Sequence, residues 1–244
     1  QKTALINQFV TIGLDTNVEI KESGIKDIGF IPKNWNIIPL KYCLEKDGIK
    51  IGPFGSSIKL DKLVEDGIKI YGQGNVIKDN FELGHRHLSL KDFEENFKQY
   101  EILNGDILIT MMGTTGKSKI FKSSYKRGIL DSHLMRLRLN QKVLLPELFV
   151  TVLQESNYIF NQIKLNSKGS IMEGLNSSIV KNLRFIVPKI EEQKDIFAKL
   201  SKQTNTLENI KESYIKKISL LNQYRQSLIS SAVTGKIRIT EDML

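Results

Sequence analysis

The chain has 244 residues, 40% of them hydrophobic, and carries 36 Lys and Arg against 27 Asp and Glu, a net charge of +9. This hydrophobic share is enough for a sizeable core, and no segment is long and apolar enough to cross a bilayer, so we expect no membrane partner. The single cysteine, Cys43, excludes an internal disulfide and a zinc site built from several cysteines. These features favour a cytoplasmic protein.

The excess positive charge lies in the middle of the chain. Residues 33–189 hold 24 Lys and Arg against 16 Asp and Glu, whereas residues 191–244 hold 9 against 7. A basic body indicates a polyanionic partner, with nucleic acid first. The alternative is a lysine-rich composition without such a partner.

Five segments are expected along the chain. Glycine, proline and apolar periodicity place their boundaries. The segments are a helix end at 1–14, a linker at 15–34, a mostly β body at 35–189, a long helix at 190–234 and a tail at 235–244. The predicted fold class is therefore α+β, with a few helices in the body.

The first segment resembles the end of the long helix. Residues 4–14 (ALINQFVTIGL) match residues 227–237 (SLISSAVTGKI) at four identical positions with one fixed offset. Such an echo indicates an internal repeat. We infer a parent pattern of body, helix, body, helix, in which residues 1–14 are the stub of the first helix.

Several runs in the body predict regular elements. Strands are expected after the turn Asn104-Gly105, at residues 133–139 and at residues 183–188, and a helix at residues 147–163. Residues 133–139 alternate, with Arg136 and Arg138 on one side. This alternation predicts one face in the core and one basic face outward.

The long helix carries apolar residues at seven-residue spacing, with Gln203, Lys217 and Ser231 as polar interruptions. This spacing predicts a coiled coil better than it predicts a helix lying on its own body. The expected interface residues are Ile196, Leu200, Leu207, Ile210, Tyr214, Leu221, Tyr224 and Leu228. At the usual rise the helix would run on the order of 65 Å, so we expect it to project and to find a partner helix.

Two motifs give weak catalytic or metal signals. Gly116-Lys117-Ser118 resembles a phosphate-binding loop, but the required first glycine is Met111 and a β-like run follows instead of a helix. We therefore expect a strand–turn–strand there. The run His85-Arg86-His87 offers two imidazoles without a third metal ligand. The residues predict a binding protein that needs no cofactor.

The strongest binding signal is a basic stretch from Lys117 to Arg138, whose cations can neutralise phosphates. The run YGQGNV at 71–76 offers amide side chains that can read base edges, although an ordinary polar turn explains it equally well. The candidate DNA contacts are Ser56, Ser57, Lys59, Gln73, Asn75, Lys78, Lys117, Lys119, Lys122 and Arg127. Trp35 and Pro32 are expected to anchor the start of the body in its core.

Five motifs in order resemble the DNA-specificity subunit of type I restriction–modification systems. They are ESGIKDIGFIPKNWNIIPLK (22–41), GPFGSSIK (52–59), LNGDILITMMGTTGK (103–117), VPKIEEQKDI (187–196) and LISSAVTGKI (228–237). Each motif alone is weak, but together they span nearly the whole chain.

The resemblance implies a target-recognition domain that reads one half of a split double-stranded DNA site. It also implies no catalytic activity of the chain itself, docking to methyltransferase subunits and, through them, to motor-nuclease subunits. Family members have two recognition domains and two long helices that pair as an antiparallel coiled coil, whereas this chain has one domain and one full helix. It is expected to be either a C-terminal half or a half-subunit that pairs with a second copy.

Two other classes of function stay open from the residues alone. One is an NTPase or nuclease that uses Lys117 and nearby acids. The other is a coiled-coil adaptor whose basic body binds an acidic protein.

Overall fold

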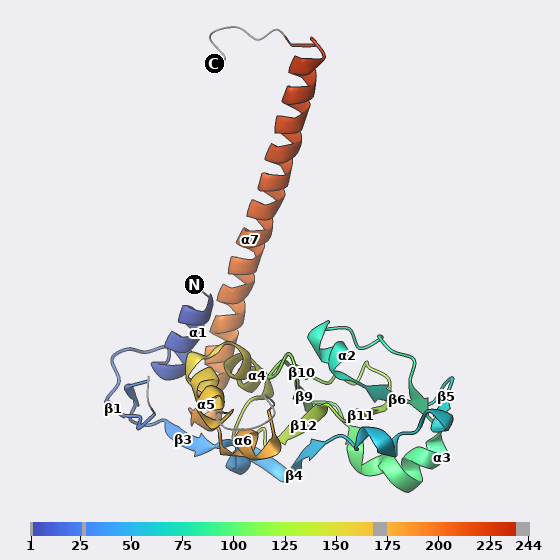
Figure 1. Cartoon of the computed structure of the whole chain (residues 1–244). Coiled ribbons are helices and arrows are strands. Elements are labelled where there is room, and N and C mark those ends of the chain that lie inside the picture. The colour runs from blue at the N-terminus through green and yellow to red at the C-terminus, as the bar shows by residue number, and fades with distance from the viewer. Residues whose placement is uncertain (1, 26–27, 168–174, 238–244) are drawn as a thin grey trace. The chain divides into compact units, whose positions relative to one another are not determined.

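The computed structural model describes residues 2–25, 28–167 and 175–237. The chain divides into two units, one formed by Thr3–Ala198 and one that begins at Lys199. The first unit has an α+β fold, as predicted, and the second consists of most of one helix (Figure 1). No helix among these residues meets the length and hydropathy that a bilayer-spanning segment needs.

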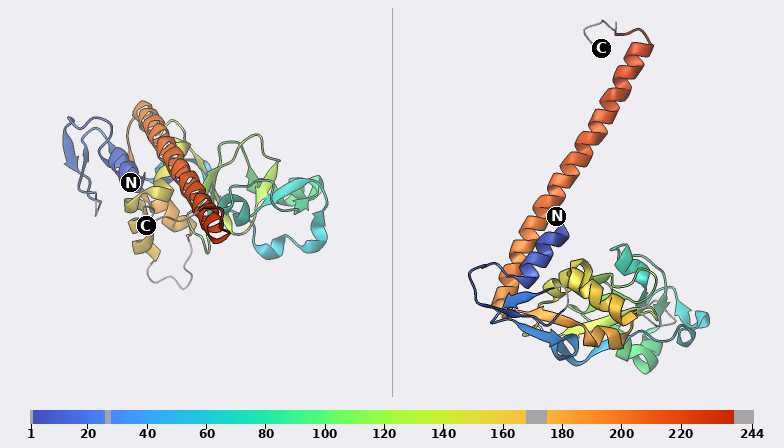
Figure 2. Two further views of the ribbon diagram at one scale, coloured as in Figure 1. Left: turned by 90° about the horizontal axis from the view of Figure 1, so that it is seen from above. Right: turned by 60° about the vertical axis from the view of Figure 1, so that its left-hand side comes forward.

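The N-terminal segment forms helix α1 (Lys2–Thr11), as predicted, and buries Ile6, Phe9 and Val10. In two views α1 runs antiparallel to the first turns of α7 (Ile190–Val233), which belong to the same unit (Figures 1 and 2). On its other side, Asn7 Oδ1 accepts a hydrogen bond of 3.1 Å from the backbone nitrogen of Asn157. Helix α1 is therefore part of the packed body.

The predicted linker contains a hairpin. Strands β1 (Ile20–Glu22) and β2 (Phe30–Pro32) pair antiparallel. Gly24 and Gly29 have φ values of 64° and 72°, a region that glycine enters without strain, so these residues support a turn between strands. Ile31 and Trp35 are fully buried, which confirms the anchoring role expected for Trp35.

One sheet of the body has four antiparallel strands in the order β10-β9-β12-β4. Their bounds are Leu44–Ile51 for β4, Ile107–Thr110 for β9, Ser118–Ile120 for β10 and Leu134–Leu139 for β12. The pairing of β9 with β10 confirms the strand–turn–strand around Gly113 and Gly116. Because a strand follows Lys117, no helix N-terminus faces this loop, and the phosphate-binding alternative loses its geometry.

A second sheet has five strands in the order β5-β7-β6-β11-β8, of which β6 and β11 are parallel. Their bounds are Leu63–Val64 for β5, Ile68–Tyr71 for β6, His87–Leu88 for β7, Glu101–Ile102 for β8 and Gly128–Leu130 for β11. One apolar cluster joins residues of both sheets and of α2 (Gln73–Ile77): Tyr71, Val76, Phe81, Ile102, Leu108, Phe121, Leu130 and Leu134. A second cluster packs the five-stranded sheet against the helical turns Phe93–Phe97 and Lys98–Tyr100, which follow the short helix α3 (Leu90–Asp92).

The remaining elements build the end of the body next to α1. Strands β3 (Asn36–Pro39) and β13 (Arg184–Val187) pair antiparallel, the latter as predicted. The single helix expected at 147–163 is two helices, α4 (Pro146–Glu155) and α5 (Asn157–Ser167), because Ser156 is extended between them. Helix α6 (Ser177–Asn182) follows, capped by the Asn176 side chain, which accepts from Ile179 N. Short 3-10 turns lie at Leu40–Cys43, Gly55–Ser57 and Leu60–Lys62.

Gln193 fixes the start of helix α7. Its side chain is fully buried, its Oε1 accepts from Leu145 N at 2.8 Å, and its Nε2 donates to Val143 O and Pro188 O at 2.8 and 2.9 Å. At the other end, Gly235 takes a φ of 71° and Lys236 N bonds back to Ser231 O at 2.8 Å, a common helix C-terminus. The long helix predicted at 190–234 is confirmed.

The basic outward face predicted for β12 is wrong. Arg136 is 6% exposed, and Arg138 makes two hydrogen bonds of 2.7 and 2.8 Å to the carboxylate of Asp106, which is itself 1% exposed. Arg136 donates to Glu101 O at 2.6 Å, and burial lowers its pKa. The turn before β9 covers this face with a buried carboxylate, so the two arginines are structural.

Candidate nucleic-acid interface

Four chain segments meet at one edge of the two sheets, where strands end. Gly52 follows β4, Gly72 follows β6, Met111 follows β9, and residues 131–133 connect β11 to β12. Backbone hydrogen bonds join them: Gly52 N to Leu134 O at 3.0 Å, Asp131 N to Tyr71 O at 2.8 Å, and Met111 N to His133 O at 3.2 Å. We call Gly52, Gly72, Met111 and residues 131–133 the strand-end junction.

The junction requires glycine where loop 52–59 leaves β4. A Cβ at position 52 would lie 2.0 Å from the backbone oxygen of Asp131, which no side chain can accommodate. Pro53 is buried directly after it, while Ser56, Ser57 and Lys59 are exposed. The loop therefore starts from a fixed point and presents short polar side chains and a lysine to solvent.

Gln73 lies at the junction, as the first residue of α2. Its Oε1 accepts hydrogen bonds from Met111 N at 3.0 Å and Met112 N at 3.1 Å. This amide oxygen thereby ties α2 to the turn that carries Lys117. Gln73 is half-buried, so its contribution to any base contact would come from its Nε2 group.

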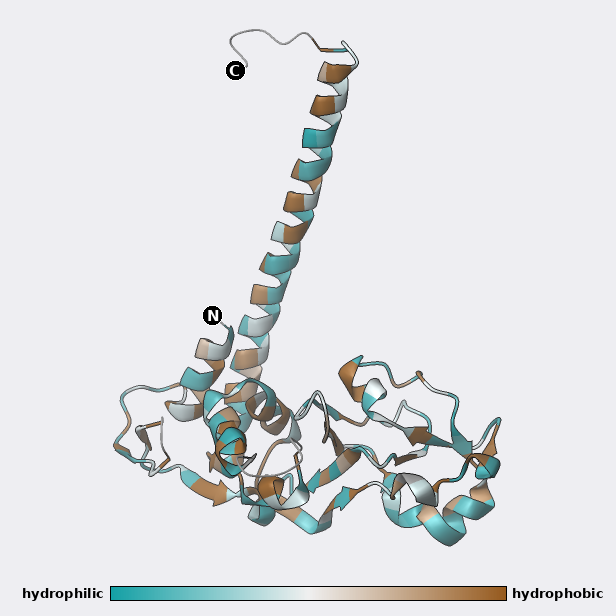
Figure 3. Cartoon of the chain, in the orientation of Figure 1, coloured by the Kyte–Doolittle hydropathy of each residue, from teal (hydrophilic) through white to brown (hydrophobic). Residues whose placement is uncertain are grey.

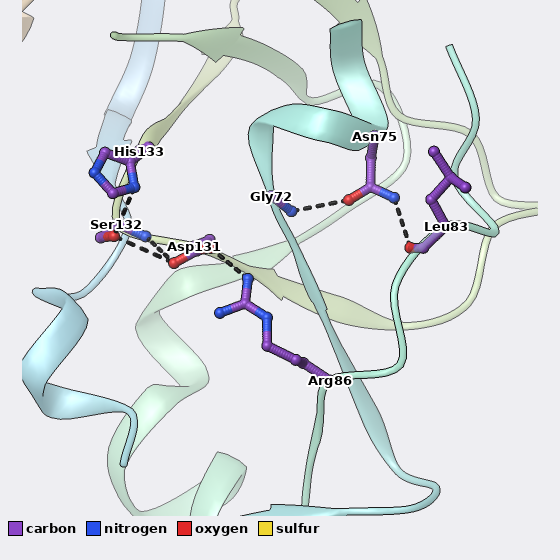
Figure 4. Close-up of polar contacts among 7 residues, drawn as sticks. All are labelled: Gly72, Asn75, Leu83, Arg86, Asp131, Ser132 and His133. Atoms are coloured by element: carbon purple, nitrogen blue, oxygen red, sulfur yellow. Dashed lines mark hydrogen bonds and ion pairs between the residues drawn. The ribbon is translucent and has the colours of Figure 1, made fainter. Parts of the chain in front are cut away.

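Asn75 is a structural residue, and its assignment as a base reader is wrong. Its side chain is 5% exposed. Its Oδ1 accepts from Gly72 N at 2.9 Å, and its Nδ2 donates to Asn80 O at 3.1 Å and to Leu83 O at 2.8 Å (Figure 4). The sequence showed an amide between glycines, but both ends of that amide hold residues 72–83 together.

Arg86 and Asp131 form an ion pair at the junction that the sequence analysis missed (Figure 4). Asp131 Oδ1 also accepts from Ser132 N at 2.7 Å, and Ser132 Oγ lies 3.1 Å from His133 Nδ1. Burial raises the pKa of Asp131, but Arg86 and the Ser132 donors outweigh it, so the pKa lies below its ordinary value. The carboxylate is therefore ionised at neutral pH. The only sign of this ion pair in the sequence analysis was the arginine in the run His85-Arg86-His87.

Some predicted cations lie on the loops and the helix around the junction. Lys117 is exposed on the turn between β9 and β10, Lys59 on loop 52–59 and Lys78 at the end of α2. None of these three lysines forms an ion pair with a described residue. Lys119, on β10, is bound to Asp79 at 2.6 Å. Three lysines thus keep their full charge for an anionic partner, whereas Lys119 shares its charge with a carboxylate.

Lys122 and Arg127 lie away from the junction. Lys122 follows β10, whose last residue pairs with the first residue of β9, and Arg127 precedes β11. Both positions are at the ends of these strands opposite the junction. Arg127 is also paired, with Glu101 at 2.6 Å and Glu94 at 3.7 Å, and the bond to Glu101 raises its pKa. The four cations predicted as phosphate contacts from Lys117 to Arg127 therefore do not gather at one edge of the sheets.

The histidine run does not form a metal site. His87 is buried in β7, and His85 is exposed before that strand, so the two imidazoles do not share a face of it. Within the described ranges, no group of three or more His, Cys, Asp or Glu residues could hold a metal ion.

The exposure of the residues in the predicted coiled-coil seam changes along α7. Ile196 and Leu200 are 0% and 2% exposed, so these first two positions are already buried within this chain and are not open to the helix of a second chain. Leu207 is half-buried, and the later seam residues are 41–64% exposed: Ile210, Tyr214, Leu221, Tyr224 and Leu228. Figure 3 shows that apolar residues recur along the helix.

The family model of the type I restriction modification DNA specificity domain matches residues 17–219. The chain therefore belongs to this family, in agreement with the resemblance of its motifs.

Individual relatives of the chain are also named as type I specificity subunits. The chain is 22% identical to the type I restriction enzyme EcoBI specificity subunit of Escherichia coli, over 71% of this chain and 36% of that protein. It is 21% identical to the MjaVIII specificity subunit of Methanocaldococcus jannaschii, over 98% of this chain and 54% of that protein. The solved HsdS subunit from Thermoanaerobacter tengcongensis has a similar fold, with a TM-score of 0.59 and 16% identity over 97% of this chain and 50% of that one. This chain thus spans about half the length, or less, of the relatives it matches.

The structural role of Asn75 predicts the effect of its removal. Asn75→Ala leaves Gly72 N and the carbonyls of Asn80 and Leu83 without their partner, so we expect a loss of about 1–3 kcal/mol in the free energy of unfolding. Urea denaturation measures this loss, and Lys78→Ala, an exposed change in the same segment, serves as the control. A stability equal to that of the Lys78→Ala variant would contradict the structural role.

Proposed function

We propose that the chain is a cytoplasmic, non-catalytic DNA-recognition module of a type I restriction–modification system. It reads one half of a bipartite site in double-stranded DNA. The observation that carries the proposal is the family match over residues 17–219. The fold supports it, since four strand-end segments meet at one edge, where loops can approach a duplex from a rigid base. The specificity subunits named among the relatives are about twice as long as this chain or longer. The activity and partners of such a whole subunit are therefore part of the proposal.

The charges around the junction support a nucleic-acid partner. Lys59, Lys78 and Lys117 are exposed, and the described residues place no carboxylate within ion-pair distance of them. Cations of this kind neutralise phosphates and position the protein, whereas base edges are read by other side chains. Three of the DNA contacts predicted from the sequence remain as candidates for reading bases, and they lie near these lysines in the sequence: Ser56, Ser57 and Gln73.

The proposed protein partners are those of the family. Methyltransferase subunits dock on the specificity subunit, and motor-nuclease subunits bind through them. An isolated module would then show sequence preference without methylating or cutting DNA, because both activities lie in other chains.

We further propose that α7 pairs antiparallel, either with the helix of a second copy of the chain or with the helix of a first recognition half. Ile210, Tyr214, Leu221 and Leu228 are exposed at seven-residue spacing in the second unit. Up to residue 237, the last that the structure describes, that unit consists largely of one helix, and no other element of this part of the unit buries the seam. A dimer formed in this way would read a symmetric split site.

The phosphate contacts predict a change in salt dependence. Lys59→Ala with Lys117→Ala should weaken binding to all sequences alike and flatten the slope of log K against log salt by about 0.9 for each lost contact. The measurement is a titration of labelled duplex at several salt concentrations, with the modification subunit present. The matched control is Lys41→Ala with Lys46→Ala, which removes the same charge at the opposite end of β4. Equal slopes for the two double variants would place the DNA elsewhere, and binding to acidic protein but not to DNA would favour the adaptor.

The seam predicts a difference between two neighbouring leucines. Leu221 and Leu220 are 57% and 55% exposed, but they lie about 100° apart around the helix. Leu221→Asp should convert a dimer of the chain to monomer, because a charge would enter the seam, whereas Leu220→Asp should leave the dimer intact. Sedimentation equilibrium gives both masses. The same mass for both variants would contradict pairing through this seam.

A further inference from the structure

Arg86 and Asp131 meet at the junction from positions 45 residues apart in the chain. Arg86 lies just before β7, where its carbonyl accepts from Ile70 N at 2.9 Å, and Asp131 lies just after β11. The Asp131 side chain is 18% exposed and the Arg86 side chain 46%. Ser132 holds the carboxylate through its backbone nitrogen and hydroxyl, at 2.7 and 3.2 Å. A largely buried anion thus fixes an arginine whose head is partly in solvent.

The guanidinium keeps donors for a further partner. One terminal nitrogen, Nη2, donates to Asp131, and Figure 4 shows the other terminal nitrogen turned away from the carboxylate. Neither that nitrogen nor Nε bonds to a residue that the structure describes. Position 72, where a Cβ would lie 3.6 Å from Nη2, is a glycine, so no side chain from there stands over the pair.

The nearby carboxylate distinguishes two kinds of DNA contact. A phosphate at Arg86 would stand close to the ionised Asp131, and the two anions would repel each other. A guanine edge is neutral and offers two acceptors, O6 and N7, which the arginine fork matches. Asp131 also holds that fork in one orientation, which lowers the entropic cost of binding a planar edge.

We propose that Arg86, oriented by Asp131, is a specificity-determining residue that reads one guanine in the major groove. The inference rests on the proposed function and deepens it by assigning one base of the half-site. Asp131 acts as a positioning residue through Arg86.

The test uses the whole chain together with its modification subunit and a pool of random duplex DNA. Wild-type protein should select a half-site with an invariant guanine, and Arg86→Ala should lower the preference for that base by roughly 10- to 100-fold while other positions stay as they are. Replacing that guanine by 7-deazaguanine, which lacks the N7 acceptor, should weaken wild-type binding but leave the Arg86→Ala variant unaffected. Asp131→Asn should reduce the same preference in part.

A second ion pair, at the other end of β11, gives a matched control. Arg127 is 48% exposed and its partner Glu101 19%, values close to those of Arg86 and Asp131. Arg127→Ala should leave the selected sequence unchanged. Thermal unfolding of Arg86→Ala and Arg127→Ala separates a loss of stability from a loss of base preference. Arg86→Lys keeps the charge but not the planar guanidinium, so it should lose the guanine preference even if Arg86→Ala fails to fold.

The outcomes separate this inference from the proposed function. If Arg86→Ala or Arg86→Lys folds and selects the same bases as wild type, the pair is structural and the guanine assignment is overturned, while DNA recognition stands. If wild-type protein selects no sequence in the complex, the proposed function itself is overturned, and the guanine assignment with it.

Discussion

The close approach of two backbones at Gly52 and Asp131 sets the geometry of the candidate interface. The chain passes from the five-stranded to the four-stranded sheet at residues 131–133, and the carbonyl of Asp131 occupies the space that a side chain at position 52 would need. Loop 52–59 must therefore leave β4 over this crossing point. Because the ends of β6 and β9 are hydrogen-bonded to the same crossing, the loops that follow them are held beside it. A surface built in this way is pre-organised for a partner.

Charge is divided between structure and surface. Arg136 and Arg138 lie against the buried carboxylate of Asp106, and Arg127 and Lys119 pair with acids at the surface. These cations contribute to the net charge of +9 but are already partly neutralised. The lysines without a carboxylate partner near the junction supply the attraction that a polyanion would experience.

The sequence predicted the parts of the fold that depend on local pattern. The strand from 134 to 139, the strand pair around Gly113 and Gly116, and the long helix all follow from period and turn residues. Local pattern did not predict features that depend on long-range contacts. The alternation of Arg136 and Arg138 was visible in the sequence, but the contact with Asp106 that covers them was not.

The candidate site was predictable only in part for the same reason. The loop at 52–59, which forms one of the motifs, and the amide of Gln73, which was singled out for its chemistry, both lie at the junction. The structural role of Asn75 depends on carbonyls five and eight residues away, and the Arg86–Asp131 pair joins residues 45 positions apart. One sequence carries no record of which distant residues meet.

Hydrogen–deuterium exchange of the whole chain with its modification subunit, with and without the selected duplex, tests most directly whether the junction is the DNA surface. The account predicts slower exchange on DNA binding at residues 52–59 and 111–117, with residues 122–127 unchanged. Protection confined to residues 122–127, at the opposite ends of the same strands, would contradict it.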